Sequence, residues 1–136
     1  MKIVFCFSGK TFPGPIRQSL EEYRKRITKY VPVEVIEAKN MHPQAREGIH
    51  IVLVPEGNSL TSEGLAKLLE RYLLSGTKYL YFYTGGPDGI PREVRENADV
   101  SLSLSSMTFN HQLIRVMLLE QVYRAFTIIH REHYHR

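Results

Sequence analysis

Short apolar runs alternate with helix-length amphipathic segments along the whole chain, and this alternation restricts the possible fold more than any other feature. Five runs have the length and composition of strands, at residues 3–7, 31–38, 51–54, 79–83 and 100–104. The connections between them suit crossovers, which join parallel strands. The sequence therefore predicts a single α/β domain over residues 1–136, in which helices flank a mostly parallel sheet.

Helical periodicity is clear between the predicted strands. In residues 16–30, apolar side chains recur every three or four positions and so share one helix face. A second helix is predicted to start at a cap on Thr61 or Ser62 and to end before Gly76. Pro91 opens a short helix that runs to about residue 98. The polar residues 39–48 are predicted to form a loop.

The last predicted helix, at about residues 111–129, is apolar around most of its circumference. Its apolar side chains are Leu113, Ile114, Val116, Met117, Leu118, Leu119, Val122, Tyr123, Phe126 and Ile129. A helix that is apolar on several sides must be buried on several sides. Because so small a domain offers little to cover it, we expect a homodimer that packs through outward positions such as Leu118 or Val122.

Charge and cysteine content narrow the functional class. Eighteen Lys and Arg against fourteen Asp and Glu give a net charge of +4, which mildly favours a polyanionic partner. The only cysteine, Cys6, cannot form an intrachain disulfide, and this fits a reducing compartment. No apolar run approaches the ~18 residues of a membrane span, and no signal-peptide pattern is found. We therefore expect a cytoplasmic protein without a membrane partner.

A glycine-rich segment, Gly85-Gly86-Pro87-Asp88-Gly89, directly follows the fourth predicted strand. We call residues 85–89 the glycine loop. Glycines allow positive φ and close approach of a ligand to the backbone, and ligands of parallel sheets gather where strands end. The segment matches neither the P-loop nor the dinucleotide-binding motif. It is therefore either a ligand-binding loop or simply a tight turn.

The segment from Leu104 to His111 is the second candidate. A strand that ends in small hydroxyl residues and enters a long helix presents free backbone N–H groups. Alternatively, Thr108 or Asn110 merely caps the helix. His111 could act as a general base, or it could be an ordinary polar surface group.

The C-terminal tail, residues 130–136, is the third candidate. It is rich in histidine, but no cysteine or carboxylate cluster completes a metal shell, so we expect no metal site. Tyr134, His135 and Arg136 could contact a base or a phosphate through stacking and charge. The alternative is a disordered, charged chain end.

Taken together, three segments resemble one family. They are the glycine loop, residues 102–111 (LSLSSMTFNH), and the run from Arg115 through residues 119–125 (LEQVYRA) to the final Tyr134-His135-Arg136. This combination resembles the RlmH family of large-subunit ribosomal RNA pseudouridine methyltransferases, of the SPOUT class, and the similarity spans the whole chain. The resemblance implies an α/β trefoil knot, a homodimer, S-adenosylmethionine as cofactor, and methylation of N3 of a pseudouridine in 23S rRNA on the assembled ribosome.

The resemblance also implies roles for particular residues. Cofactor contacts are expected at Leu53, Gly85, Leu104, Ser105, Ser106, Met107, Thr108 and Phe109. The catalytic and substrate-side residues are expected to be His111, Tyr134, His135 and Arg136. His111 is the first candidate to accept the N3 proton, and Arg136 could stabilise the resulting anionic base or hold a phosphate. No metal is needed for this chemistry.

The chain departs from the family in three places. Residues 39–48 are shorter than usual, Asn58 stands where a lysine is common, and Asn110 stands where a proline is common. Three alternatives stay open beside the resemblance: a non-catalytic ribosome- or RNA-binding domain, a tRNA methyltransferase of the same class, and a flavodoxin-like protein that binds a small molecule.

Overall fold

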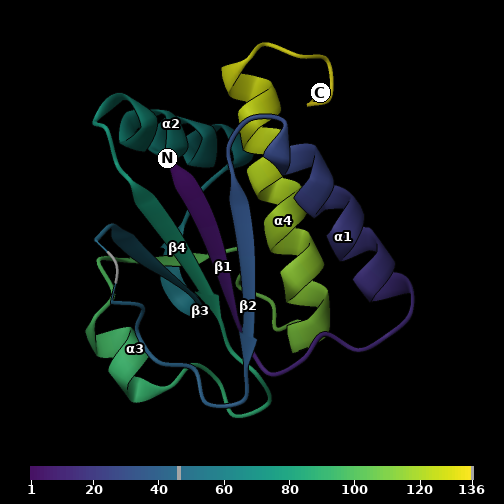
Figure 1. Cartoon of the computed structure of the whole chain (residues 1–136), viewed down its shortest axis with the longest axis vertical. Coiled ribbons are helices and arrows are strands. Elements are labelled where there is room, and N and C mark those ends of the chain that lie inside the picture. Colours follow the sequence, from purple (N-terminus) through teal and green to yellow (C-terminus); the bar gives the residue numbers. More distant parts are fainter. Residues whose placement is uncertain (46, 136) are drawn as a thin grey trace.

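The chain folds around a single five-stranded sheet with the order β2-β1-β4-β3-β5 (Figure 1). The computed structural model describes residues 1–45 and 47–135. The strands are β1 (Lys2–Ser8), β2 (Val33–Ala38), β3 (Ile49–Ser59), β4 (Tyr79–Thr84) and β5 (Val100–Ser103). Every pairing between them is parallel. The predicted α/β class is therefore confirmed, whereas the knot stays a prediction from the resemblance.

Four helices flank the sheet: α1 (Pro15–Thr28), α2 (Ser62–Leu74), α3 (Arg92–Glu96) and α4 (His111–Ile129). The Thr61 side chain caps α2 by accepting the Gly64 N–H at 3.0 Å, and Gly76 follows that helix with a positive φ of 76°. Both predicted helix signals are confirmed. In the described part of the chain, residues 39–45 contain no helix, and no helix is long and apolar enough to cross a membrane.

Both faces of the sheet are buried, and β1 shows why its sequence is apolar at every position. Ile3, Phe5 and Phe7 pack in the core formed with α1, α2 and α4. Val4 and Cys6 point to the opposite face, where Val94 of α3 covers them. Alternate side chains of a strand point to opposite faces, so a sheet covered on both sides needs continuous apolar runs.

Strand β3 differs from its prediction, because it continues past Pro55 instead of ending there. Leu102 of β5 pairs first with Leu53 and again with Asn58, so the residues between them form a bulge. Proline is tolerated in a bulge because no ladder hydrogen bond is required from it. A Cβ on Gly57 would lie 2.7 Å from the Leu102 carbonyl carbon, so this close approach requires glycine. We call residues 53–57 the β3 bulge.

Helix α4 has the predicted bounds, but the prediction that Leu118 and Val122 face outward is wrong. Their side chains are 1% and 0% exposed, and they pack in the core with α1 and α2 of the same chain. A charge at either position would disrupt this core rather than separate two subunits. The apolar side chains of α4 that remain accessible include Leu113, which is 42% exposed, and the half-buried Met117.

Candidate cofactor pocket and C-terminal tail

A hollow with a volume of about 480 Å³ lies where β4 and β5 end, beside the bulge of β3. We call it the strand-end hollow. Its walls are the β3 bulge, the glycine loop, and the segment that leads from β5 into α4. Most of the predicted cofactor contacts line it, namely Leu53, Gly85, Leu104, Ser105, Met107, Thr108 and Phe109, whereas Ser106 does not. Three segments far apart in sequence therefore meet at the edge of the sheet where α/β proteins bind ligands.

The glycine loop folds tightly back on itself. The Gly89 N–H donates a hydrogen bond to the Gly86 carbonyl oxygen at 3.0 Å, and Gly89 has a φ of 80°. A Cβ on Gly85 would lie 2.6 Å from the Gly89 carbonyl carbon and 2.9 Å from the Ile90 nitrogen. The two interpretations of this segment are thus compatible, because the loop is a tight turn and also forms a wall of the hollow.

Thr84, the last residue of β4, supplies a polar group that the sequence did not point to. Its side chain lines the strand-end hollow and is only 2% exposed. Among the described residues its hydroxyl has no hydrogen-bond partner. A buried hydroxyl without a partner is unfavourable by about 1–3 kcal/mol. A ligand that fills the hollow could provide the missing hydrogen bond.

The start of α4 combines a helix cap with a wall of the hollow. The Asn110 side chain accepts the Gln112 N–H at 2.8 Å, so Asn110 does cap the helix. The next residue, His111, is half-buried and lines the strand-end hollow. Its ring is nearly perpendicular to that of Phe12, with 6.3 Å between the ring centres. His111 is therefore placed beside any ligand that occupies the hollow.

The C-terminal tail is docked, so the interpretation of residues 134–135 as a disordered end is wrong. Tyr134 donates a hydrogen bond to Glu120 at 3.1 Å, and its hydroxyl lies 3.3 Å from that of Tyr23. Burial and the contact with Tyr23 raise the pKa of Tyr134, which keeps the phenol protonated. His135 Nε2 lies 2.7 Å from a carboxylate oxygen of Glu63. Arg136 lies outside the described residues.

Within one chain, His111 does not meet the predicted catalytic residues of the described part of the tail, Tyr134 and His135. Glu120, which binds Tyr134, is nine positions after His111 on α4, about 14 Å along the helix axis. Figure 1 shows the arrows of β1 and β2 pointing toward the end of the molecule where α4 begins, while the C-terminus lies at the other end. His111 and the tail therefore belong to separate places on one subunit.

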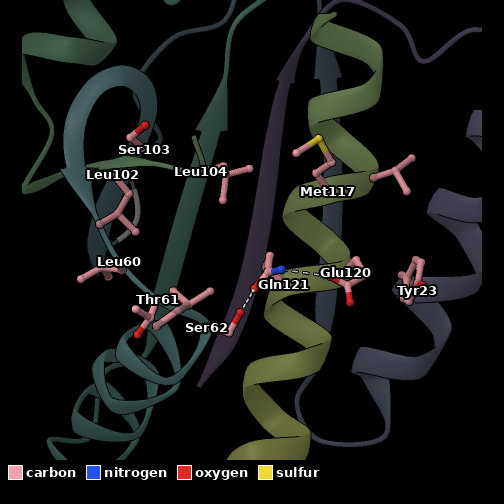
Figure 2. A pocket seen from close by; sticks show the side chains of 12 residues that line it. Tyr23, Leu60, Thr61, Ser62, Leu102, Ser103, Leu104, Met117, Glu120 and Gln121 are labelled. Carbon is pink, nitrogen blue, oxygen red and sulfur yellow. Dashed lines mark hydrogen bonds between the residues drawn. The ribbon is translucent and has the colours of Figure 1, made fainter. Parts of the chain in front are cut away.

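A second hollow, with a volume of about 570 Å³, lies between α4, the end of β5 and the start of α2, and Tyr23 of α1 also lines it (Figure 2). We call it the helix hollow. Its apolar lining includes Leu60, which is 44% exposed, and Met117. On its polar side, Ser62 donates a hydrogen bond to Gln121 at 2.8 Å. The lining also includes Tyr23 and Glu120, which contact the tail. Tail and helix hollow thus share one surface.

In the part of the chain that the structure describes, no group of three or more His, Cys, Asp or Glu side chains could hold a metal ion. Two of the tail histidines, His130 and His135, have other contacts instead. His130 stacks on Tyr30 with 5.0 Å between ring centres, and His135 Nδ1 lies 3.1 Å from a guanidinium nitrogen of Arg124.

Comparisons with known proteins agree with this architecture. The model of a family described as "Predicted SPOUT methyltransferase" matches residues 1–135. A ribosomal RNA large subunit methyltransferase H from Coprothermobacter proteolyticus is 40% identical over 139 residues, and the alignment covers all of both chains. A protein of the same name from Acetivibrio thermocellus is 37% identical over 159 residues, again with full coverage of both.

A solved structure shares the fold. The probable methylase family protein from Haemophilus influenzae Rd KW20 superimposes with a TM-score of 0.57 at 8% identity, covering 99% of this chain and 70% of that one. The family match and the curated relatives span essentially the whole sequence. The chain therefore belongs to the SPOUT methyltransferase family, in the group whose curated members are named ribosomal RNA large subunit methyltransferase H.

Proposed function

We propose that the protein transfers a methyl group from S-adenosylmethionine to ribosomal RNA of the large subunit, at N3 of a pseudouridine in 23S rRNA on the assembled ribosome, in the cytoplasm. The observation that carries this proposal is the strand-end hollow. In a member of the SPOUT methyltransferase family, it unites the glycine loop, the β3 bulge and the segment before α4. The names of the curated relatives support RNA of the large subunit as the substrate.

The residues around the strand-end hollow fit a cofactor of this size and polarity. A volume of about 480 Å³ lies in the range of small-molecule sites. Thr84 offers a buried hydroxyl that has no partner among the described residues, and the glycines of the glycine loop present backbone without side chains. We assign cofactor binding to Leu53, Gly85 and residues 104–109. When bound, S-adenosylmethionine supplies an activated methyl group on its sulfonium.

The protein's own residues must then position the base and accept its proton. N3 of a pseudouridine carries a hydrogen that leaves when the methyl group is added. His111 lines the strand-end hollow at the start of α4, within reach of a base that enters it, and we assign it as the proton acceptor. A positioned general base contributes typically 10²- to 10⁴-fold to the rate. We assign Tyr134, His135 and Arg136 to recognition of the RNA.

A homodimer would bring these two groups together. His111 and the docked tail are separated along α4 of one chain, so a complete site needs a tail from elsewhere. The helix hollow has an apolar lining beside the tail, and a second copy of this chain would cover that lining. In the proposed dimer, the tail of each subunit reaches the strand-end hollow of its partner.

A charge in the helix hollow should separate the subunits without unfolding them. Met117 lines this hollow and is half-buried, unlike the fully buried Leu118 next to it. We expect light scattering to show a dimer for the wild type at micromolar concentration and a monomer for Met117→Lys. Circular dichroism should show the same helix content in both. A monomeric wild-type protein would contradict the proposed dimer.

The proposed activity is tested with ribosomes purified from a strain that lacks the modification. We expect the protein to transfer labelled methyl groups from S-adenosylmethionine to 23S rRNA, and mass spectrometry to locate them on N3 of a pseudouridine. Methylation of tRNA but not of ribosomes would favour the tRNA alternative. Tight ribosome binding without methyl transfer or cofactor binding would favour a non-catalytic RNA-binding domain.

A further inference from the structure

The loop that follows β1 carries an exposed aromatic ring. Phe12 is 61% exposed, which is unusual for so large an apolar side chain. Among the described residues, the other exposed large apolar side chains are Leu60, Leu74, Met107 and Leu113, so Phe12 is the aromatic member of this set. Because most of the ring is accessible, the fold itself gains little from it.

The backbone of this loop is nevertheless held firmly by α4. The Phe12 N–H donates a hydrogen bond to Gln112 Oε1 at 2.9 Å, and Gln112 Nε2 donates to the Lys10 carbonyl oxygen at 3.0 Å. The Gln112 side chain is only 3% exposed. One buried amide thus binds the backbone on both sides of Thr11 and fixes the position from which the Phe12 ring projects.

A buried network of charged side chains also fixes this loop. Arg115 is 0% exposed, and it donates hydrogen bonds to the Thr11 hydroxyl at 2.9 Å and to the Ser8 carbonyl oxygen at 2.8 Å. Glu37 accepts the Thr11 N–H at 2.6 Å and lies 3.5 Å from the guanidinium of Arg115. Burial lowers the pKa of Arg115, and Glu37 opposes this shift. A fully buried arginine is unfavourable unless it is paired and hydrogen-bonded, and here its contacts serve to fix the loop.

The fixed ring stands beside the proposed proton acceptor. The rings of Phe12 and His111 are nearly perpendicular, with 81° between their planes and 6.3 Å between their centres, and His111 lines the strand-end hollow. Because the Phe12 side chain is 61% exposed, most of its ring surface remains available next to the place where a target nucleotide must enter. Lys10, exposed in the same loop, supplies a positive charge for a neighbouring phosphate.

We propose that Phe12 is a substrate-binding residue that stacks on an unpaired base of the RNA beside His111. This inference rests on the proposed function and names a contact that orients its substrate. Unpaired bases of RNA stack on aromatic side chains, and the stacking tolerates any base because every base has an aromatic face. A second copy of the chain is the less suitable occupant, because the helix hollow, which Phe12 does not line, provides an apolar surface for it.

Kinetics with ribosomes from the modification-deficient strain test the proposal. We expect Phe12→Ala to raise KM for ribosomes about ten- to a hundredfold, the range expected for loss of one base–aromatic stack. Phe12→Tyr should retain the wild-type KM, whereas Phe12→Leu, which is apolar but not aromatic, should resemble Phe12→Ala. Affinity for S-adenosylmethionine, melting temperature and dimerisation should not change. Leu74→Ala, which removes an 83% exposed apolar side chain at the end of α2, is the matched control.

A fluorescent reporter provides a readout that does not depend on activity. The chain contains no tryptophan, so Phe12→Trp introduces a single indole at this site. We expect ribosomes from the modification-deficient strain to quench its fluorescence at concentrations that saturate binding, measured as the difference from the same mixture with the tryptophan-free wild-type protein. Four results would each overturn the proposal. They are a wild-type KM in Phe12→Ala, a wild-type KM in Phe12→Leu, loss of the dimer in Phe12→Ala, and an unquenched indole. If the wild type transfers no methyl group, the proposed function fails, and the quenching measurement still decides whether the ring stacks.

Discussion

Gly85→Ala should reduce the affinity for S-adenosylmethionine by about a hundredfold or more, which corresponds to about 2.7 kcal/mol, while the protein stays folded. The added Cβ would lie 2.6 Å from the Gly89 carbonyl carbon and 2.9 Å from its Cα. These are backbone atoms, so the clash is relieved only if the glycine loop opens. Since this loop forms one wall of the strand-end hollow, opening it changes the shape of the proposed cofactor site.

Titration calorimetry measures this loss, and a melting curve shows whether the variant is folded. Gly64→Ala is the matched control, because it makes the same chemical change in α2, where the new Cβ would lie 3.3 Å from the Thr61 hydroxyl and no closer to any other atom. We expect the control to bind the cofactor like the wild type. If Gly85→Ala folds and keeps full affinity, the glycine loop does not belong to the cofactor site.

The sequence predicted the secondary structure well where local signals decide it. The Thr61 cap, Gly76 and the apolar pattern of residues 111–129 all mark ends that the structure confirms. Strand β3 was predicted too short, because Pro55 is an ordinary strand terminator unless a bulge accommodates it. That bulge depends on pairing with Leu102, more than forty residues away, and no local pattern reveals it.

The burial of α4 shows a second limit of periodicity. The apolar pattern correctly indicated that several sides of the helix are buried, but not which element covers each side. The structure places α1 and α2 over Leu118 and Val122, and it leaves Met117 in the helix hollow. The tertiary arrangement decides which apolar side chains of α4 lie in the internal core and which lie on the proposed dimer surface. The sequence alone indicates only that several sides of the helix are buried.

The sequence likewise indicated some residues of the candidate site and missed others. Residues of the glycine loop and of 104–109 were singled out because glycine and hydroxyl residues follow predicted strands, and the structure brings most of them to one hollow. Thr84 and the contacts of Arg115 and Gln112 gave no such signal. Each depends on partners distant in sequence, or in the case of Thr84 on the lack of one among the described residues.

Mixing two inactive variants should restore activity if the site is shared between subunits. We expect His111→Ala alone to transfer methyl groups about 10²- to 10⁴-fold more slowly than the wild type, as expected for loss of a general base. A chain that lacks residues 134–136 should also be inactive on ribosomes. Its melting temperature should fall by only a few degrees, since the deletion removes a small number of hydrogen bonds around Tyr134. Both variants should still bind S-adenosylmethionine and dimerise.

Exchange of subunits between the two variants gives mixed dimers with two unlike sites. One site combines His111 of the truncated chain with the tail of the His111→Ala chain, and it is complete; the other lacks both. If the subunits mix at random, half of the dimers are mixed and each has one working site, so about a quarter of the wild-type activity should return. A tail that served the hollow of its own chain would leave every site in the mixture incomplete. Two affinity tags demonstrate that the subunits exchange. If the mixture nevertheless remains as inactive as its components, the shared site is ruled out, and the tail acts where it is docked, against Tyr23 and Glu120.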